Sequence, residues 1–243
     1  MTKVSVGWMY PDLLNLHGER ASVQMLNRVG NAMGISVEIL KLSDPKAPIP
    51  FEELDLLIFL PGEITAFRTI IPVLKANDGF RSYVEKGGYV LAIGTTGVLF
   101  GRQITRLDGS VVEGLGILDL TATEREYVWG NDLHLRMNDT KQELVGSQIQ
   151  MVNVDAKQPL AQVLYGMGNH NSGTDGARYK NVMYTNCLGP LFVKNPWFAE
   201  EILKDICLKK YLGIEKAQGG GLADHSFDAT LKWISSKPSQ PNN

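Results

Sequence analysis

In the first hundred positions, short continuous runs of hydrophobic residues alternate with longer segments in which apolar residues recur at helical spacing. The runs predict strands at residues 4–8, 35–40, 54–60 and 89–93. Residues 54–60 are so apolar that we expect this strand to be covered on both faces, and residues 89–93 are also wholly apolar. The longer segments predict helices at 21–33, 67–76 and 80–86. Alternating strands and helices imply right-handed βαβ units. We therefore expect an α/β fold with an open, mostly parallel, twisted sheet and flanking helices.

The second half of the chain predicts added antiparallel strands. Residues 102–112 alternate between polar and apolar types around Asp108-Gly109, which predicts a hairpin. Further strands are predicted at 117–121, 133–137, 143–150, 162–165 and 179–186, and a helix at 197–211. Residues 166–176 are rich in Gly, Asn and Ser and predict a loop longer than an ordinary connection.

The last thirty residues differ in composition from the rest. After Gly213 the chain is polar, contains Gly219-Gly220-Gly221 and ends in Pro, Ser and Asn residues. We expect residues 1–213 to form a single domain. Residues 214–243 should form a polar C-terminal tail that is partly flexible, with one short helix around Trp233.

Composition and charge narrow the function classes. Of 243 residues, 44% are hydrophobic and 21% charged, and the formal net charge is −2. Without a basic excess, binding to nucleic acid through bulk charge is not expected. The two cysteines have no metal-ligand spacing, so no metal site, disulfide framework or cofactor is predicted. The chain starts on a strand-like run without a basic leader and has no membrane-spanning stretch; we expect a soluble cytoplasmic protein.

Two strand ends are the natural place for a site. In open α/β sheets, ligands bind at the carboxyl ends of the strands. Here those ends read Leu60-Pro61-Gly62-Glu63 and Ile93-Gly94-Thr95-Thr96-Gly97.

Several segments, in order and in register, resemble the CobB/CobQ-type class I glutamine amidotransferases. The resemblance runs from residue 4 to about residue 212, and it is strongest to the GatD-type glutaminase subunits of the lipid II amidating MurT/GatD complex. The matching segments are 10–20 (Tyr-Pro-Asp-Leu-Leu-Asn-Leu-His-Gly-Glu-Arg), Asp108-Gly109, 112–119, 179–182, Gly189-Pro190-Leu191 and Lys194-Asn195-Pro196.

The resemblance implies a class I amidotransferase-like fold and a defined chemistry. In that family, a cysteine on a tight strand-to-helix turn attacks the carboxamide of glutamine, and a histidine takes its proton. The turn presents backbone N–H groups to the developing oxyanion. Ammonia then passes to a partner subunit that activates the acceptor carboxylate.

This chain departs from the family pattern where that chemistry is located. The family turn reads I-C-G-G-Y-Q-x-L-G, and Gly94 stands at the cysteine position. The histidine segment reads G-T-Y-L-H-G-P, and Leu188 stands at the histidine position. The resemblance therefore supplies no catalytic residue. The candidate pocket consists of Gly62, Gly94, Thr95, Thr96, Cys187 and Leu188.

Two further family segments also differ. The glycine-rich I-G-G-G strand end is 59–62 here, with one glycine kept. The F-E-N-H-G-G stretch becomes 147–152 (Ser-Gln-Ile-Gln-Met-Val), and the position of an arginine that helps to hold glutamine falls near Val128. Loss of either member of a nucleophile–base pair costs several orders of magnitude in rate, so we expect no glutamine hydrolysis.

Three hypotheses follow. The first is a non-catalytic amidotransferase-like subunit that works with a Mur-ligase-like partner in cell-wall precursor metabolism. The second is an active amidotransferase, of the lipid II isoglutaminyl or cobyric acid synthase type, with a relocated nucleophile. It requires a polar pocket at Gly94, and an apolar plug of Leu188 and Val98 would count against it. The third is a regulatory module that binds a small molecule in the degenerate glutamine pocket.

The remaining polar residues are interpreted mainly as structural. The hydroxyls of Thr95 and Thr96 are expected to satisfy backbone groups at the turn, and Cys187 and Cys207 to be packed thiols. His134 is expected on an exposed strand face, His170 in a loop and His225 in the tail. His17, in the opening motif, either lines the strand-end region or only supports the loop structure. Val128-Trp129 is either an exposed partner-binding element or a strand segment packed inward.

Overall fold

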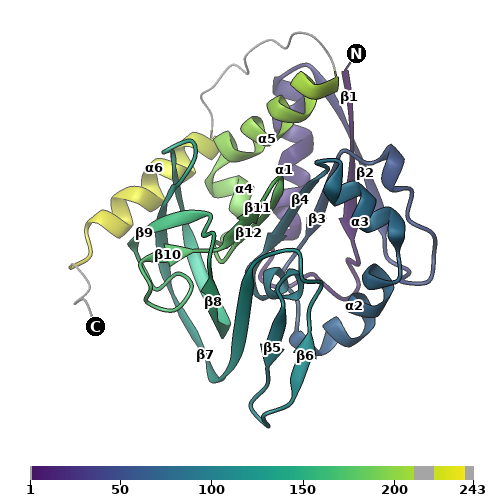
Figure 1. Cartoon of the computed structure of the whole chain (residues 1–243). Coiled ribbons are helices and arrows are strands. Elements are labelled where there is room, and N and C mark those ends of the chain that lie inside the picture. Colours follow the sequence, from purple (N-terminus) through teal and green to yellow (C-terminus); the bar gives the residue numbers. More distant parts are fainter. Residues whose placement is uncertain (1, 211–221, 239–243) are drawn as a thin grey trace.

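The computed structural model describes residues 2–210 and 222–238, and four strands of its first half with two later ones form the predicted, mostly parallel sheet. This six-stranded sheet, here called sheet A, has the order β11-β12-β4-β3-β1-β2 (Figure 1). All of its neighbouring pairs are parallel except β11–β12. Its strands are β1 (Thr2–Met9), β2 (Ile35–Leu42), β3 (Leu56–Phe59), β4 (Tyr89–Ile93), β11 (Ala177–Tyr179) and β12 (Val182–Thr185).

Helices cover both faces of sheet A, which confirms the predicted α/β fold with flanking helices. Buried side chains of β3 alternate between two core clusters: Leu56 and Ile58 belong to one, Leu57 and Phe59 to the other. The first cluster is closed by α1 (Arg20–Ala32), α4 (Leu191–Lys194) and α5 (Pro196–Lys210), the second by α2 (Phe67–Lys75) and α3 (Asp78–Glu85). Short 3-10 helices are η1 (Phe51–Glu53), η2 (Ile64–Ala66) and η3 (Gly94–Phe100).

A second, mixed sheet, sheet B, is built from the added strands of the second half. Its order is β10-β9-β7-β5-β6, and β8 pairs with β7. The strands are β5 (Gln103–Thr105), β6 (Val111–Glu113), β7 (Leu120–Met137), β8 (Glu143–Ala156), β9 (Ala161–Tyr165) and β10 (Thr174–Asp175). The β5–β6 hairpin around Asp108-Gly109 is confirmed.

Three strand predictions need correction. The strands predicted at 117–121 and 133–137 are parts of β7, which starts at Leu120 and continues for 18 residues with a register shift between Glu124 and Trp129. The strand predicted at 179–186 is a tight antiparallel pair, since β11 ends at Tyr179 and β12 begins at Val182. Lys180, with φ of +50°, turns the chain between them. The predicted loop 166–176 includes the short strand β10.

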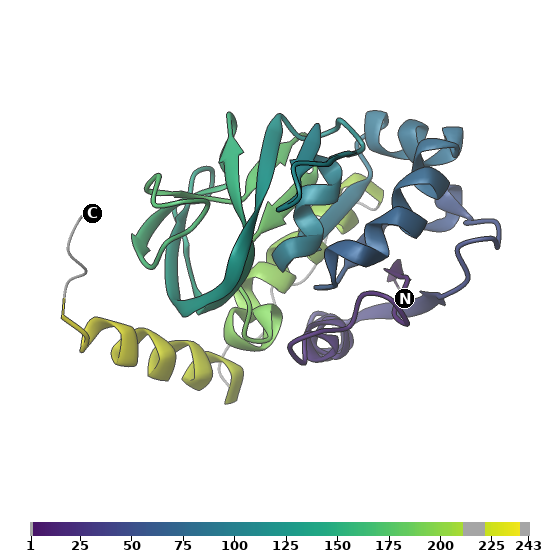
Figure 2. The same ribbon diagram turned by 90° about the horizontal axis from the view of Figure 1, so that it is seen from below.

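The helix expected around Trp233 is present as α6 (Leu222–Ser235). It lies along the side of the molecule next to the second sheet (Figure 2). Ile234 is its buried anchor, Lys194 donates a hydrogen bond to Thr230, and Trp233 donates one to Asp132. The triple glycine 219–221 and Leu212 lie outside the described residues. A domain boundary at residue 213 therefore stays a prediction.

No helix within the described parts of the chain has the length and hydrophobicity that crossing a bilayer requires.

The hairpin is fastened to β7 by an ion pair, which gives a first testable prediction. Arg106 Nε donates to Glu124 Oε2 at 2.6 Å, and this hydrogen bond is the main cause that lowers the pKa of Glu124 below its ordinary value of 4.5. The ionised pair therefore stabilises the fold above about pH 4.5, and its contribution is lost as the pH falls through the lowered pKa. We expect Arg106→Ala to reduce the free energy of unfolding by about 1 kcal/mol near pH 7.

Urea unfolding of Arg106→Ala and the unchanged protein, at roughly pH 7 and roughly pH 3, measures this difference. It should shrink on acidification, because protonation of Glu124 progressively removes the ion pair from the unchanged protein. A difference that stays constant between the two pH values would contradict the assignment.

Candidate functional site

At the carboxyl edge of sheet A, β4 turns sharply into η3. Gly94, at the turn, has φ of +65°, a conformation that residues with side chains rarely adopt. A Cβ added at Gly94 would lie 3.2 Å from Leu188 Cδ2 and 3.2 Å from Pro61 Cγ. The space in front of the turn is therefore already occupied by apolar atoms.

The structure brings the six candidate pocket residues into one neighbourhood. Leu188 lies against Gly94, and Thr96 Oγ1 donates a hydrogen bond of 2.8 Å to the carbonyl of Leu60. Gly62 comes two residues after Leu60, and a Cβ added there would lie 2.3 Å from Leu14 of the opening loop. The residues gather, but they are buried: Gly62, Gly94, Thr95, Thr96, Cys187 and Leu188.

Two expectations concern this buried region: hydrogen bonding by the threonine hydroxyls, and an apolar plug formed by Leu188 and Val98. The hydroxyl of Thr96 satisfies a backbone carbonyl, as expected from the sequence. Leu188 fills the space at Gly94, whereas Val98 is fully buried in the second core cluster. Apolar side chains of Leu188 and Pro61 therefore lie directly beside Gly94.

Cys187 is a packed thiol. It is fully buried, and its Sγ lies 4.0 Å from the carbonyl oxygen of Leu188. Burial raises the pKa of the thiol well above its usual range, and the nearby carboxyls of Asp175 and Glu19 raise it further. A thiol in such surroundings stays protonated and unreactive. Cys207 is also buried, within α5.

Glu19 is a site residue that the sequence reasoning did not single out. Its carboxylate is fully buried and accepts hydrogen bonds from the backbone N–H of Gly189 (2.7 Å), the N–H of Leu191 (3.0 Å) and the hydroxyl of Ser22 (2.9 Å). It thereby ties the opening loop to the segment that holds Leu188. In the sequence, only its place in the motif 10–20 pointed to Glu19. Its role depends on burial, because a buried carboxylate needs several hydrogen-bond donors.

A second missed feature is a buried polar network around Asp175. Asp175 accepts from Thr185 Oγ1 at 2.7 Å and from the side-chain amide of Asn186 at 2.9 Å, and burial raises its pKa. Asn186 also accepts from the hydroxyl of Tyr184 at 2.6 Å. The network immobilises the strand that leads to Cys187 and Leu188.

The stretch that replaces F-E-N-H-G-G fastens the long loop. Gln148 is fully buried, donates to the carbonyl of Gly168 at 2.7 Å and accepts from the N–H of Gly168 at 3.1 Å. Val128, the position assigned to the glutamine-holding arginine, is 58% exposed. Arg125, three residues earlier, instead donates to Asn153 at 2.6 Å.

His17 is the histidine near the strand end, because the N–H of its neighbour Leu16 donates to the carbonyl of Pro61 at 2.9 Å. His134 was expected on an exposed face, but its side chain is only 13% exposed, because its ring packs beside β8 and bonds to Glu143 at 2.8 Å. His17 is an exposed loop residue with φ of +60°. His170 and His225 are exposed too. Among the described residues, no three His, Cys, Asp or Glu side chains gather as metal ligands would.

The ring of Tyr184 occupies the space beside Gly97 in which a side chain at position 97 would lie. A Cβ added at Gly97 would lie 1.8 Å from Cδ2 of the Tyr184 ring. The family patterns have the reverse arrangement, with tyrosine at the position of Gly97 and glycine at the position of Tyr184. In this chain, the ring that occupies the space beside Gly97 comes from β12.

The described part of the chain contains, among others, three surface cavities. One of ≈ 440 Å³ lies at the amino ends of β3 and β4 and is lined by Tyr83, Tyr89 and Lys209 among others. One of ≈ 380 Å³ lies beneath α6 next to Ser147, and one of ≈ 270 Å³ adjoins α3. None of the three is lined by any of the six candidate pocket residues.

Two curated relatives match most of the chain. The lipid II isoglutaminyl synthase (glutamine-hydrolyzing) subunit GatD of Streptococcus pneumoniae (strain ATCC BAA-255 / R6) is 27% identical over 219 residues, which cover 86% of this chain and 82% of that protein. The subunit of the same name from Staphylococcus aureus (strain N315) is 24% identical over 232 residues, which cover 88% and 89%. No protein-family model matches. The chain is class I glutamine amidotransferase-like and GatD-related.

The fold of this GatD-related chain agrees with that relationship. A crystal structure of a glutamine amidotransferase superimposes with a TM-score of 0.53 at 14% identity, over 82% of this chain and 98% of the other. The sharp turn at Gly94 lies at the carboxyl edge of sheet A, where ligands of open α/β sheets bind.

Proposed function

We propose that this chain is the amidotransferase-type subunit of a two-component complex that amidates a cell-wall precursor of the lipid II type, and that it does not itself hydrolyse glutamine. The two relatives are subunits of lipid II isoglutaminyl synthase by name, which supports the first part. The partner would be a Mur-ligase-like subunit, as the family resemblance implies, and both would act in the cytoplasm.

One observation carries the second part of the proposal. Gly94 stands at the turn where a nucleophile is needed, and the atoms of Leu188 and Pro61 lie 3.2 Å from the point at which any side chain would begin. Neither leucine nor proline can take up a proton. The turn therefore offers no thiol at position 94 and no base at position 188, and apolar atoms lie close to both.

A relocated nucleophile receives little support from the neighbouring residues. The raised pKa of Cys187 and its complete burial disfavour a thiolate. The hydroxyl of Thr96 donates to a backbone carbonyl and has no base beside it in the contacts described. Binding of a small regulatory molecule at the turn stays a prediction.

A comparison of nitrogen donors tests the proposed function. The purified chain is mixed with the Mur-ligase-like subunit of the same organism, ATP and the acceptor, and supplied with either glutamine or ammonium. We expect amidated product with ammonium, no product with glutamine, and no release of glutamate above that of a protein-free blank. Release that disappears in Cys187→Ala or Thr95→Ala would overturn the loss of hydrolysis.

A double variant, Gly94→Cys with Leu188→His, places a cysteine and a histidine at the two positions where the family pattern has them, and it is compared with Gly94→Cys alone. Gly94→Cys alone should stay inactive, since a thiol without a base reacts slowly and this one would press against Leu188. The double variant supplies both groups and relieves one of the two contacts. Any glutamate release should therefore appear only in the double variant.

A further inference from the structure

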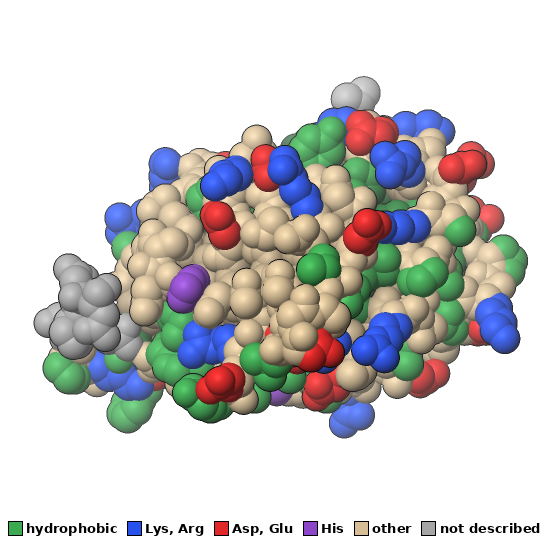
Figure 3. Space-filling model, turned by 60° about the horizontal axis from the view of Figure 1, so that its bottom comes forward, with side chains coloured by type: hydrophobic (Ala, Val, Ile, Leu, Met, Phe, Trp, Pro, Cys, Tyr) green, Lys and Arg blue, Asp and Glu red, His purple; other side chains and the backbone are tan. Residues whose placement is uncertain are grey.

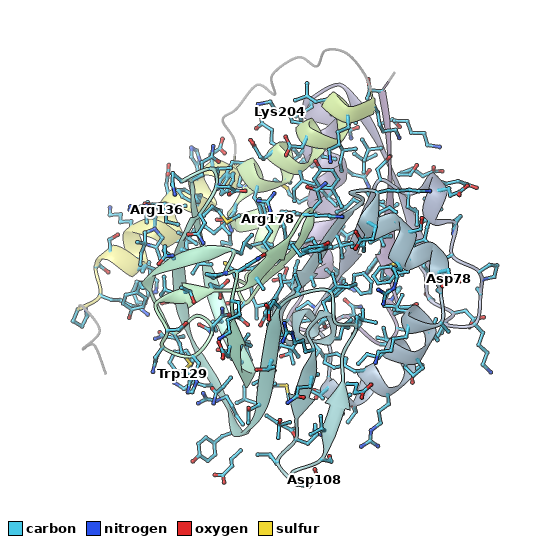
Figure 4. All side chains as sticks on the ribbon, viewed as in Figure 1. Asp78, Asp108, Trp129, Arg136, Arg178 and Lys204 are labelled. Carbon is cyan, nitrogen blue, oxygen red and sulfur yellow. The ribbon has the colours of Figure 1, made fainter. Side chains whose placement is uncertain are left out.

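The cavity of ≈ 440 Å³ at the amino edge of sheet A lies between the two helical layers of the molecule. Residues of α3 and α5, which cover different faces of the sheet, line it; Figure 4 labels Asp78 at the start of α3 and Lys204 on α5. A cavity of this volume falls within the range of small-molecule sites, about 300–1,000 Å³. Its apolar wall combines residues of both core clusters: Phe51, Leu54, Tyr83, Tyr89 and Ile206.

The aromatic side chains of this cavity are held in place by packing and by a hydrogen bond. The ring of Tyr83 lies directly against Gly88, where an added Cβ would be 2.3 Å from Cε1 of the ring. The hydroxyl of Tyr83 donates a hydrogen bond of 2.9 Å to the carbonyl of Tyr89. The ring centroids of Phe51 and Tyr83 lie 6.0 Å apart. The aromatic wall is therefore pre-formed, so a ligand that binds there orders few side chains.

Charged side chains complete the lining: Glu52, Asp55, Lys86, Lys209 and Lys210. Lys210 Nζ lies 2.7 Å from Asp55 Oδ2, so these two charges balance each other. Within the described part of the chain, Lys86, Lys209 and Glu52 form no ion pair. The ammonium group of Lys209 instead lies 4.4 Å from the centroid of the Tyr89 ring. Three lysines against two acids give the lining one net positive charge.

The charge around the cavity suits a ligand with a single anionic group. α3 and α5 both end at the rim, where the helix dipoles oppose part of the lysine charge. Arg178 and Asp205 act on Tyr89 with opposite signs, and neither of them lines the cavity. The formal net charge of the chain is −2, and basic and acidic side chains are interspersed on the face shown in Figure 3. Attraction of an anion therefore depends on Lys86 and Lys209.

Two hydroxyl groups supply further polar contacts for a ligand. Ser82 and Tyr89 line the cavity, and no hydrogen bond among the described residues uses either hydroxyl. Burial raises the pKa of Tyr89 to about 12, so this hydroxyl stays protonated at neutral pH and can donate. The lining thus combines aromatic rings, two unpaired ammonium groups and two hydroxyls.

We propose that the cavity at the amino edge of sheet A binds a small aromatic molecule with one anionic group, of the aromatic carboxylate type. The rings of Tyr83 and Tyr89 contact the aromatic part of the ligand, because aromatic rings attract each other in offset and edge-to-face arrangements. The ammonium groups of Lys86 and Lys209 bind its carboxylate through charge-assisted hydrogen bonds. This site is independent of the proposed function, since Tyr89 and Gly94 lie at opposite ends of β4, roughly 16 Å apart.

Titration with three small probes tests the chemical class of the ligand. The purified full chain is titrated with cinnamate, cinnamamide and acetate at neutral pH, and binding is measured by calorimetry. We expect one cinnamate to bind per chain with a dissociation constant below about 1 mM. Cinnamamide, which keeps the ring and lacks the charge, should bind at least about tenfold more weakly. Acetate, which keeps the charge and lacks the ring, should show no saturation in the same range.

Variants of the lining test the location of the site. Lys86→Gln/Lys209→Gln should weaken cinnamate at least about tenfold and leave cinnamamide within about twofold. Ser82→Phe, which places a ring in the cavity, should remove binding of both compounds. Lys204→Gln is the matched control, because this exposed lysine of α5 does not line the cavity. It should bind like the unchanged chain, and the lysine variants should keep the thermal midpoint. No saturable binding of cinnamate, equal affinity for cinnamamide, or full affinity in the double lysine variant would each overturn the proposal.

Discussion

Gly97→Ala should destabilise the protein by about 3 kcal/mol or more, because the new methyl group has no space. Its Cβ would lie 1.8 Å from Cδ2 of the Tyr184 ring. That ring cannot move aside easily, since it is fully buried and its hydroxyl is bound to Asn186 within the polar network. A loss of this size lowers the midpoint of thermal unfolding of a domain of this length by roughly 6–12 °C, which calorimetry or circular dichroism measures.

Gly130→Ala is a suitable control for that experiment. Gly130 is an exposed residue of β7, and its nearest neighbour to an added Cβ is the carbonyl oxygen of Gln148 at 3.4 Å. Its unfolding free energy should change by less than about 1 kcal/mol. Tyr184→Leu should partly rescue Gly97→Ala, so the double variant should lose less stability than the sum of the single ones. Full additivity would show that the two side chains do not compete for space.

Replacing Glu19 by Ala should cost about 3 kcal/mol of unfolding free energy, because it leaves buried donors without an acceptor. Those donors are the N–H groups of Gly189 and Leu191 and the hydroxyl of Ser22. Glu19→Gln should cost less, since one amide oxygen still accepts. Denaturant unfolding measures both variants, and equal stability of Glu19→Ala and the unchanged chain would exclude the proposed role of the carboxylate.

The pH dependence of the Glu19→Gln comparison has a definite sign. Burial raises the pKa of Glu19 above its ordinary value of 4.5. The folded state therefore holds a proton more tightly than the unfolded state between that value and the raised pKa. Over this window, the stability of the unchanged chain relative to Glu19→Gln should fall as the pH rises. A difference that grows with pH would mean that the hydrogen bonds outweigh burial.

The parallel sheet was predictable because its two central strands, β3 and β4, are wholly apolar. Residues 54–60 and 89–93 carry no polar side chain that could face solvent apart from Asp55, and β3 and β4 fall within these runs. β7 was harder to predict, since a register shift between Glu124 and Trp129 breaks its alternation into two short patterns. The β11–β12 turn was missed because Lys180 is not a residue type that usually signals a positive φ.

The sequence predicted which residues form the candidate site, but not the long-range contacts that bury them. The strand ends and the motif 10–20 indicated which segments meet, since carboxyl ends of parallel strands share one edge. Contacts such as that of Glu19 with Gly189 link residues 170 positions apart, and local patterns carry no information on such pairs. The exposure of Tyr127 and Val128 follows from the register shift, so it became visible only in the structure.

The exchange of volume between positions 97 and 184 has a consequence for how such a chain can evolve. With tyrosine at 184, no larger residue than glycine fits at 97. With tyrosine at both positions, two rings would compete for one space. A chain with tyrosine at 97 and glycine at 184 would therefore differ from this one by two coupled substitutions, because either one alone leaves the shared space overfilled or empty.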